Sequence, residues 1–222
     1  MQTIVDWSFT LLDIVCMTAC SVYLVFLLPR SEKSTGRKKM PRIVRAAVWV
    51  GFALMTVMIP TVWRDDSVTM ITLTLYYVLI GYLLYHMDKV GILYQVCFML
   101  CMYATQVIAI FTAVKLREMY SLEYRTYAYM VVVLKESLLI AVTFVFRALI
   151  RKRYMTVQPR FQIRGMILVP VISMILIFMF MIGSDVFLLR FGYEWLIVYC
   201  VLILVINLYS LYFWYDVSKT QE

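Results

Sequence analysis

The sequence predicts an all-α membrane protein, a bundle of about seven transmembrane helices with its N-terminus outside and its C-terminus in the cytoplasm. Hydrophobic residues make up 64% of the 222 positions and charged residues only 15%, whereas soluble domains carry about 25% charged residues. The apolar residues gather in runs of about 20, the length that crosses a bilayer as a helix. Fifteen of the 21 Lys and Arg residues fall on one side of that membrane.

Seven apolar stretches form the expected spans. Each is too long for a buried strand and lacks sustained alternation, and a helix satisfies its own backbone polar groups in lipid. The spans cover Ile4–Pro29, Ile43–Trp63, Thr69–Tyr85, Ile92–Val114, Thr126–Ile150, Met166–Gly183 and Tyr193–Tyr215. Pro60 is expected to end the second helix. If the third and fourth spans instead form one re-entrant hairpin, the flanking charges keep their sides.

The linkers orient the bundle. Arg30–Arg45 holds seven basic residues and one acid, and Arg147–Arg164 holds six basic residues and no acid. Both linkers belong in the cytoplasm by the positive-inside rule. The net charge of +8 reflects this topology and attraction to anionic inner-leaflet lipid. It therefore predicts a lipid bilayer as partner and needs no nucleic acid to explain it.

Three ionisable residues lie within expected spans, where charges are costly and usually find partners in the bundle interior. Asp13 and Lys135 are each nine residues from the outer start of their spans, roughly 13 Å deep. Equal depth permits an ion pair between them, whereas Glu136 points about 100° away and needs another partner or a proton. The three residues form either an interhelical clamp or part of a ligand-linked switch or proton path.

The cysteines and the single histidine offer little chemistry. Cys16 and Cys20, and likewise Cys97 and Cys101, are four residues apart. No suitably spaced His or carboxylate accompanies them, so small packing residues are expected and no metal or cofactor is predicted. His86 is interpreted as an interfacial residue. A catalytic pair of His86 with Cys97 is the alternative.

Other residues suit signal input and output. Pro170 in the sixth span, followed by Ser173, can kink its helix and act as a hinge. Asn207 is expected to form a hydrogen bond across helices. The last span ends in interfacial aromatics and continues towards the cytoplasm without a helix breaker, through Tyr212, Tyr215 and Asp216. Outer residues that could meet a ligand, chosen by side and chemistry, are Trp63, Arg64, Asp65, Asp66, Arg117, Glu118 and Asp185.

Two motifs resemble a known family. The stretch Leu168–Ser173, followed by a short apolar span, resembles the penultimate membrane segment of GHKL-type sensor histidine kinases, which include the AgrC-like peptide-pheromone receptors of Gram-positive bacteria. The stretch Asn207–Lys219 is similar to the exit of their last span. The basic run Arg147–Arg153 fits the same layout. The resemblance implies a short peptide ligand, a homodimer, and a downstream kinase module with a response regulator.

The sequence contains no nucleotide-binding motif, so no kinase activity is expected from these 222 residues themselves. We expect residues 1–216 to form a transmembrane sensor domain in a bacterial cytoplasmic membrane, and residues 217–222 to begin a cytoplasmic connecting helix. The sensor would bind an extracellular peptide or small amphipathic ligand. A small transporter with Asp13, Lys135 and Glu136 lining a path is the first alternative, and a membrane peptide-processing Cys protease the second.

Overall fold

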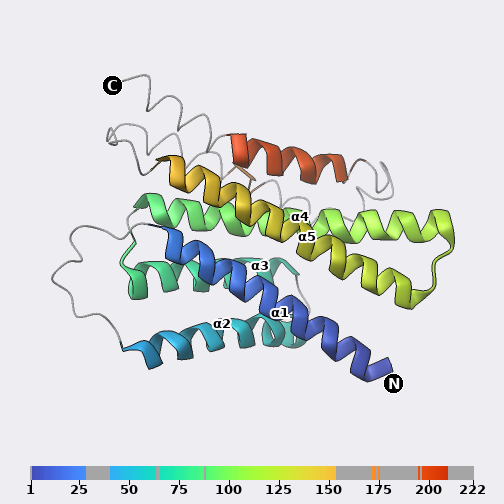
Figure 1. The fold of residues 1–222 in the computed structure, drawn as a ribbon, viewed down its shortest axis with the longest axis horizontal. Helices are drawn as coiled ribbons and strands as arrows, with labels where there is room; N and C mark the ends of the chain where they lie inside the picture. The colour runs from blue at the N-terminus through green and yellow to red at the C-terminus, as the bar shows by residue number, and fades with distance from the viewer. Residues whose placement is uncertain are drawn as a thin grey trace. The chain divides into compact units, whose positions relative to one another are not determined.

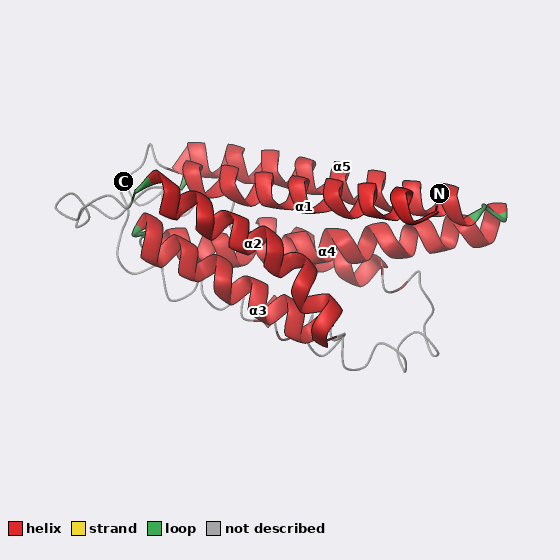
Figure 2. Cartoon of the chain, turned by 90° about the horizontal axis from the view of Figure 1, so that it is seen from below, coloured by secondary structure: helices red, strands yellow, loops and turns green. Residues whose placement is uncertain are grey.

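In the computed structural model, residues 2–28, 41–63, 66–87, 89–153 and 197–209 are described, together with residues 172, 173, 175 and 195. These parts consist of helices and the turns between them, and they contain no β-strand (Figures 1 and 2). A π-helical turn, Ile80–Leu84, continues helix α3. The helices are α1 (Gln2–Leu27), α2 (Arg42–Trp63), α3 (Asp66–Leu79), α4 (Lys89–Tyr120) and α5 (Tyr124–Arg153).

Four helices are long and apolar enough to cross a membrane, over the windows Ser8–Leu27, Arg42–Ile59, Gly91–Tyr120 and Tyr124–Ile150. Two shorter apolar helices, Val68–Leu84 and Ile197–Tyr209, also coincide with expected spans. The prediction of an all-helical protein is therefore confirmed for the described residues, and four of the helices have the length and composition of membrane spans. The number of seven spans and their orientation stay predictions, and most of Met166–Gly183 lies outside the described residues.

One helix end agrees with the expectation and another differs. Helix α2 ends at Trp63, the predicted end of the second span and three residues after Pro60. A proline removes a single N–H donor, so a short helical stretch can still follow it. Helix α4 continues to Tyr120, past the expected end at Val114, because charged residues that end an apolar run do not end a helix.

The chain forms two compact units, Met1–Met99 and Leu100–Glu222, and helix α4 runs from the first into the second. In unit 1 the helices alternate in direction (Figure 1). Phe26 at the end of α1 packs edge-on against Tyr85 at the end of α3, with ring centroids 5.7 Å apart. Trp49, in the second turn of α2, donates a hydrogen bond to the same Tyr85. The end of α1, the start of α2 and the end of α3 therefore lie together.

In unit 2 the buried residues of α5 and of the Ile197–Tyr209 helix follow one face of each helix. On α5 they recur at three- and four-residue steps, which is the spacing of a helix face. This face carries Glu136, Leu139, Thr143, Phe146 and Ile150. On the Ile197–Tyr209 helix the buried face carries Cys200, Ile203 and Asn207. Each helix thus buries one stripe and leaves the other outside.

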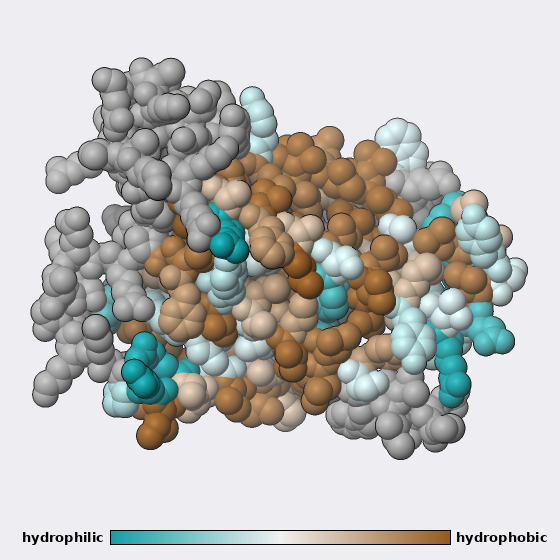
Figure 3. All heavy atoms as spheres, in the orientation of Figure 1, coloured by the Kyte–Doolittle hydropathy of each residue, from teal (hydrophilic) through white to brown (hydrophobic). Residues whose placement is uncertain are grey.

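The outward stripes are apolar, as lipid-facing surfaces of a membrane protein must be. Leu11 and Val15 of α1, Leu54 of α2, Leu75 of α3 and Val133 of α5 are each more than half exposed. Figure 3 shows hydrophobic residues covering most of the described surface in view. In water such a surface would be an aggregation hazard, whereas in a bilayer it is the solvated surface.

Candidate functional site

Unit 1 contains a buried group of residues joined by hydrogen bonds and close contacts, which we call the Gln95 cluster. It consists of Ser21, Tyr77, Gly81 and Gln95. The side chains of Ser21, Tyr77 and Gln95 are fully buried. Tyr77 Oη donates a hydrogen bond to the backbone oxygen of Ser21 (2.9 Å). Gln95 Nε2 donates to the backbone oxygen of Tyr77 (3.3 Å). The cluster therefore ties α1, α3 and α4 together through polar contacts within an apolar interior.

Gly81 is required by the position of the Gln95 carboxamide. A Cβ atom built on Gly81 would lie 2.6 Å from both Cδ and Nε2 of Gln95 and would overlap its Oε1. Gln95 Oε1 is buried and has no hydrogen-bond partner in the described part of the chain. The carboxamide thus rests against the bare backbone of Gly81 with one of its two polar ends unsatisfied, which costs free energy in a buried site.

The end of the π-turn is closed by a left-handed residue. His86 has φ 50°, and Met87 N–H donates to the backbone oxygen of Gly81 (3.1 Å). In an α-helix a left-handed residue at this position completes a Schellman cap with a bond spanning six residues. Here the bond spans one residue more because the last turn is a π-turn. His86 therefore serves as a cap, and His is among the residues that tolerate this conformation.

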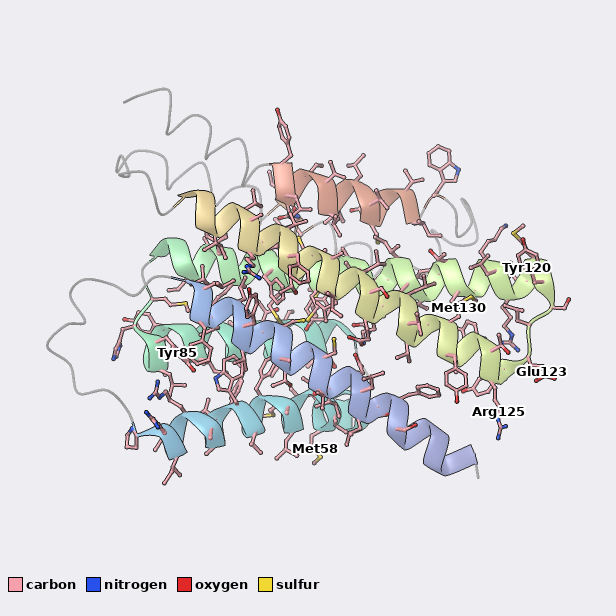
Figure 4. The ribbon with its side chains drawn as sticks, in the orientation of Figure 1. Met58, Tyr85, Tyr120, Glu123, Arg125 and Met130 are labelled. Carbon is pink, nitrogen blue, oxygen red and sulfur yellow. The ribbon has the colours of Figure 1, made fainter. Side chains whose placement is uncertain are left out.

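Aromatic rings surround the cluster at the same end of unit 1. Trp49 Nε1 donates to Tyr85 Oη (3.0 Å), and Trp49 packs edge-on against Phe52 with centroids 5.7 Å apart. Phe52 is fully buried and also lies 5.8 Å from the ring of Tyr77. Figure 4 shows the labelled Tyr85 at the end of α3. Because Tyr85 follows the π-turn directly, the register of that turn fixes the partner of Trp49.

The predicted intramembrane charges are all described. Asp13 and Lys135 are partly buried, whereas Glu136 is 7% exposed and both its carboxylate oxygens are buried. Asp13 belongs to unit 1 and Lys135 to unit 2, so the ion pair predicted between them stays a prediction. Glu136 lies eleven residues before Arg147 on α5, a rise of about 16 Å. This depth is near the middle of a bilayer about 30 Å thick.

In unit 2 the structure brings together two residues that the sequence singled out. Asn207 Nδ2 donates a hydrogen bond to Ser173 Oγ (2.8 Å) and another to the backbone oxygen of Ile203 (2.8 Å). Asn207 is fully buried and Ser173 is 2% exposed. The prediction that Asn207 forms a hydrogen bond across helices is therefore confirmed. Pro170, Tyr212, Tyr215 and Asp216 lie outside the described residues.

The hairpin of α4 and α5 carries Arg117 and Glu118. Ser121 has φ 48°, and Leu122 N–H donates to the backbone oxygen of Arg117 (3.3 Å), which caps α4 in the ordinary Schellman way. The Arg117 guanidinium lies over the ring of Tyr127, 5.3 Å from its centroid. Figure 4 shows Tyr120, Glu123 and Arg125 at the tip of this hairpin.

The other predicted ligand-proximal residues lie largely outside the described part of the chain. Only the helical backbone of Trp63 and Asp66 is described, and Arg64, Asp65 and Asp185 lie outside the described residues. Arg117 and Glu118 are the two members of the set whose side chains are described, and both are exposed.

The alternative catalytic pair is poorly placed. Lys89 begins α4 and Cys97 follows eight residues later, a rise of about 12 Å from the turn that holds His86. Cys97 is 1% exposed, and the ring of its buried neighbour Phe98 lies tilted against that of Tyr77, with centroids 6.4 Å apart. Within the described residues no group of three or more His, Cys, Asp or Glu side chains could hold a metal ion.

Sequence reasoning did not single out Gln95 or Gly81. One signal for Gln95 was available, because a neutral polar residue within the apolar run of the fourth span usually has an interhelical partner. Gly81 carries no such signal, since its role follows from the antiparallel pairing of α3 with α4. Comparison with protein-family models, with curated proteins and with solved structures finds no match to this chain.

Proposed function

We propose that this chain is the sensor domain of a bacterial two-component signalling receptor, a GHKL-type sensor histidine kinase of the AgrC-like kind. The single observation that supports the proposal best is the hydrogen bond from Asn207 to Ser173 (2.8 Å). Ser173 ends one of the two motifs that carry the family resemblance, and Asn207 begins the other. The two motifs therefore meet in a buried contact, 34 residues apart in sequence.

Such a contact suits signal output. Asn207 lies on the buried face of the last described helix, and the sequence after it leads towards the expected cytoplasmic side. A ligand that favours one packing of the Ser173 segment against this helix would shift the helix and whatever follows it. The ligand can act only through different affinities for the two packings, and about 1–3 kcal/mol of coupling would be ordinary.

The ligand would be an extracellular peptide or small amphipathic molecule that binds near the outer loops. Arg117 and Glu118, at the α4–α5 hairpin, are the described candidates for contact with it. The family resemblance adds a homodimer, a downstream kinase module and a response regulator, in the cytoplasmic membrane of a Gram-positive bacterium. The output step would pass through the last helix to the kinase module.

Phosphorylation in native membrane vesicles tests the proposal. Vesicles of the source organism that contain the natural gene product would receive radiolabelled ATP and the low-molecular-mass peptide fraction of spent culture medium. The fraction should change histidine phosphorylation of the receptor or its kinase partner several-fold, and protease treatment of the fraction should abolish the change. Absence of histidine phosphorylation under all of these conditions would contradict the assignment.

Variants of the Asn207 contact test the output path. Asn207→Leu and Ser173→Ala should each reduce the response, and the double variant should do no worse than Asn207→Leu alone because both changes remove one contact. Val205→Ala is the matched control, since Val205 lies on the same helix and is 54% exposed. A full response from Asn207→Leu at normal protein levels would show that the signal takes another route.

One observation favours a small transporter as a second candidate. Glu136 places a buried carboxylate near the middle of α5, and intramembrane carboxylates often mark ion or proton paths. Proteoliposomes loaded with a pH-sensitive dye would detect proton movement under an imposed potential. Proton flux that Glu136→Gln abolishes, with no effect of the peptide fraction on phosphorylation, would favour this second candidate over the sensor.

A further inference from the structure

In the π-turn of unit 1 a rare helical turn and a buried, unpaired polar atom occur together, and a left-handed residue closes the turn. A π-helix is rare and is found mostly as a single turn, often at functional positions. A fully buried carboxamide oxygen, Gln95 Oε1, has no hydrogen-bond partner within the described residues. The turn ends in a left-handed residue, His86 (φ 50°). The π-turn and the unpaired oxygen make this arrangement less stable than an ordinary α-helical end, and the left-handed His86 caps the longer turn.

We propose that the π-turn Ile80–Leu84 is a conformational switch, latched by the Gln95 carboxamide against Gly81, and that releasing the latch separates Tyr85 from Trp49. The Gln95 carboxamide makes two contacts. Gln95 Nε2 holds the backbone oxygen of Tyr77, just before the π-turn (3.3 Å), and Oε1 rests on Gly81 within the turn. The carboxamide therefore contacts both sides of the point where α-helix becomes π-helix.

Release of the latch changes the direction of the residues that follow. A π-turn holds one residue more than an α-helical turn, so its conversion to α-helix rotates the next residues by about 100° around the helix axis. Tyr85 is the first residue after the turn. Its hydrogen bond with Trp49 (3.0 Å) and its edge contact with Phe26 (5.7 Å) both depend on its present direction.

The change would be transmitted to the start of α2. Trp49 lies seven residues after Arg42, which begins that helix, and its indole N–H loses its described partner when Tyr85 turns away. The end of α1 loses the Phe26 contact in the same step. The switch therefore acts on the end of unit 1 that joins α1 to α2, without any part of the sensor proposal being needed.

Fluorine NMR of the full chain in lipid nanodiscs tests the switch. The protein would be labelled with 5-fluorotryptophan, and the Trp49 signal assigned from its loss in Trp49→Phe. Gln95→Ala removes the carboxamide, and Gly81→Ala displaces it. If the latch holds the π-turn, both variants should move Trp49 to the same second signal and change the ratio of the two signals at least tenfold. Leu83→Ala is the control, because Leu83 lies in the π-turn but is 53% exposed.

The alternative is a fixed π-turn that only shapes the packing. In that case the Trp49 signal keeps its wild-type position in Gln95→Ala, or the two variants give two unrelated signals, and either result overturns the proposal. Gln95→Met guards against misfolding, because it removes both polar atoms of the carboxamide and keeps the side-chain volume. It should give the same second signal, and a wild-type signal from a folded Gln95→Met protein would also overturn the proposal.

Discussion

Two glycines in helices have close neighbours in the structure and lead to a prediction. At Gly81 an added Cβ would lie 2.6 Å from Cδ and Nε2 of Gln95, a fully buried residue. At Gly51 an added Cβ would meet only Tyr76 Oη, at 2.9 Å. That oxygen ends a long side chain in a part-buried position, and it can move. The same Gly→Ala change therefore meets a fixed obstacle at one site and a movable one at the other.

Gly81→Ala should lower the free energy of unfolding, whereas Gly51→Ala should leave it unchanged or raise it. Replacing a helical glycine by alanine gains about 0.5–1 kcal/mol of backbone entropy. At Gly81 this gain is outweighed by overpacking of about 1–3 kcal/mol and by loss of the Gln95–Tyr77 hydrogen bond, about 0.5–1.5 kcal/mol. Gly81→Ala should therefore destabilise the protein by about 0.5–4 kcal/mol, whereas Gly51→Ala should be neutral or stabilise it by up to about 1 kcal/mol.

Reversible unfolding in mixed micelles, followed by far-UV circular dichroism, measures these differences. A second measurement repeats Gly81→Ala in a Gln95→Ala background, where the obstacle is absent and the destabilisation caused by Gly81→Ala should shrink. Equal stability of Gly81→Ala and Gly51→Ala would refute the reasoning. So would an unchanged destabilisation by Gly81→Ala after Gln95 has been truncated.

Three further predictions concern single side chains. His86→Gly should raise the free energy of unfolding by up to about 1 kcal/mol because φ is 50°, whereas the β-branched His86→Val should lower it. The same unfolding measurement checks both variants. A lower free energy of unfolding for His86→Gly would contradict the role of His86 as a cap. Tyr77→Phe removes a buried hydrogen bond of 2.9 Å and should lower the free energy of unfolding by about 0.5–1.5 kcal/mol. Tyr76→Phe should lower it less, because its hydrogen bond is 3.3 Å long and only part-buried. Equal losses for the two variants would contradict this ranking. Lys135→Met should abolish the peptide response in the phosphorylation assay, and a variant that folds and responds normally would show that the predicted ion pair is not required.

The helical fold could be predicted because long apolar runs have one solution in lipid. The expected spans from Ile4 to Ile150 coincide with α1 to α5, including the Thr69–Tyr85 span over α3 and its π-turn. The exact ends were less predictable, since α4 ends where Ser121 turns left-handed and not where Lys115 appears. Charge decides where a helix leaves lipid, whereas backbone conformation decides where it ends.

The candidate sites were predictable only in part. Asn207 was found because a lone amide in an apolar run needs a partner, and Ser173 is that partner. The Gln95 cluster was missed because its meaning depends on register: Gly81 matters only once α3 and α4 pair in antiparallel fashion. No periodicity in the sequence predicts a π-turn, which adds a single residue to a helix that otherwise keeps its pattern.

The lengths of α4 and α5 have a mechanical consequence. Their apolar windows contain 30 and 27 residues, or roughly 45 and 40 Å of helix, whereas the hydrocarbon layer is only about 30 Å thick. Helices of this length that run along the bilayer normal would extend beyond the hydrocarbon layer, whereas tilted helices would lie more fully within it. A change in the tilt of α4 and α5 therefore moves the turn at Ser121 relative to the lipid headgroups. Every backbone hydrogen bond within the two helices stays intact during this movement.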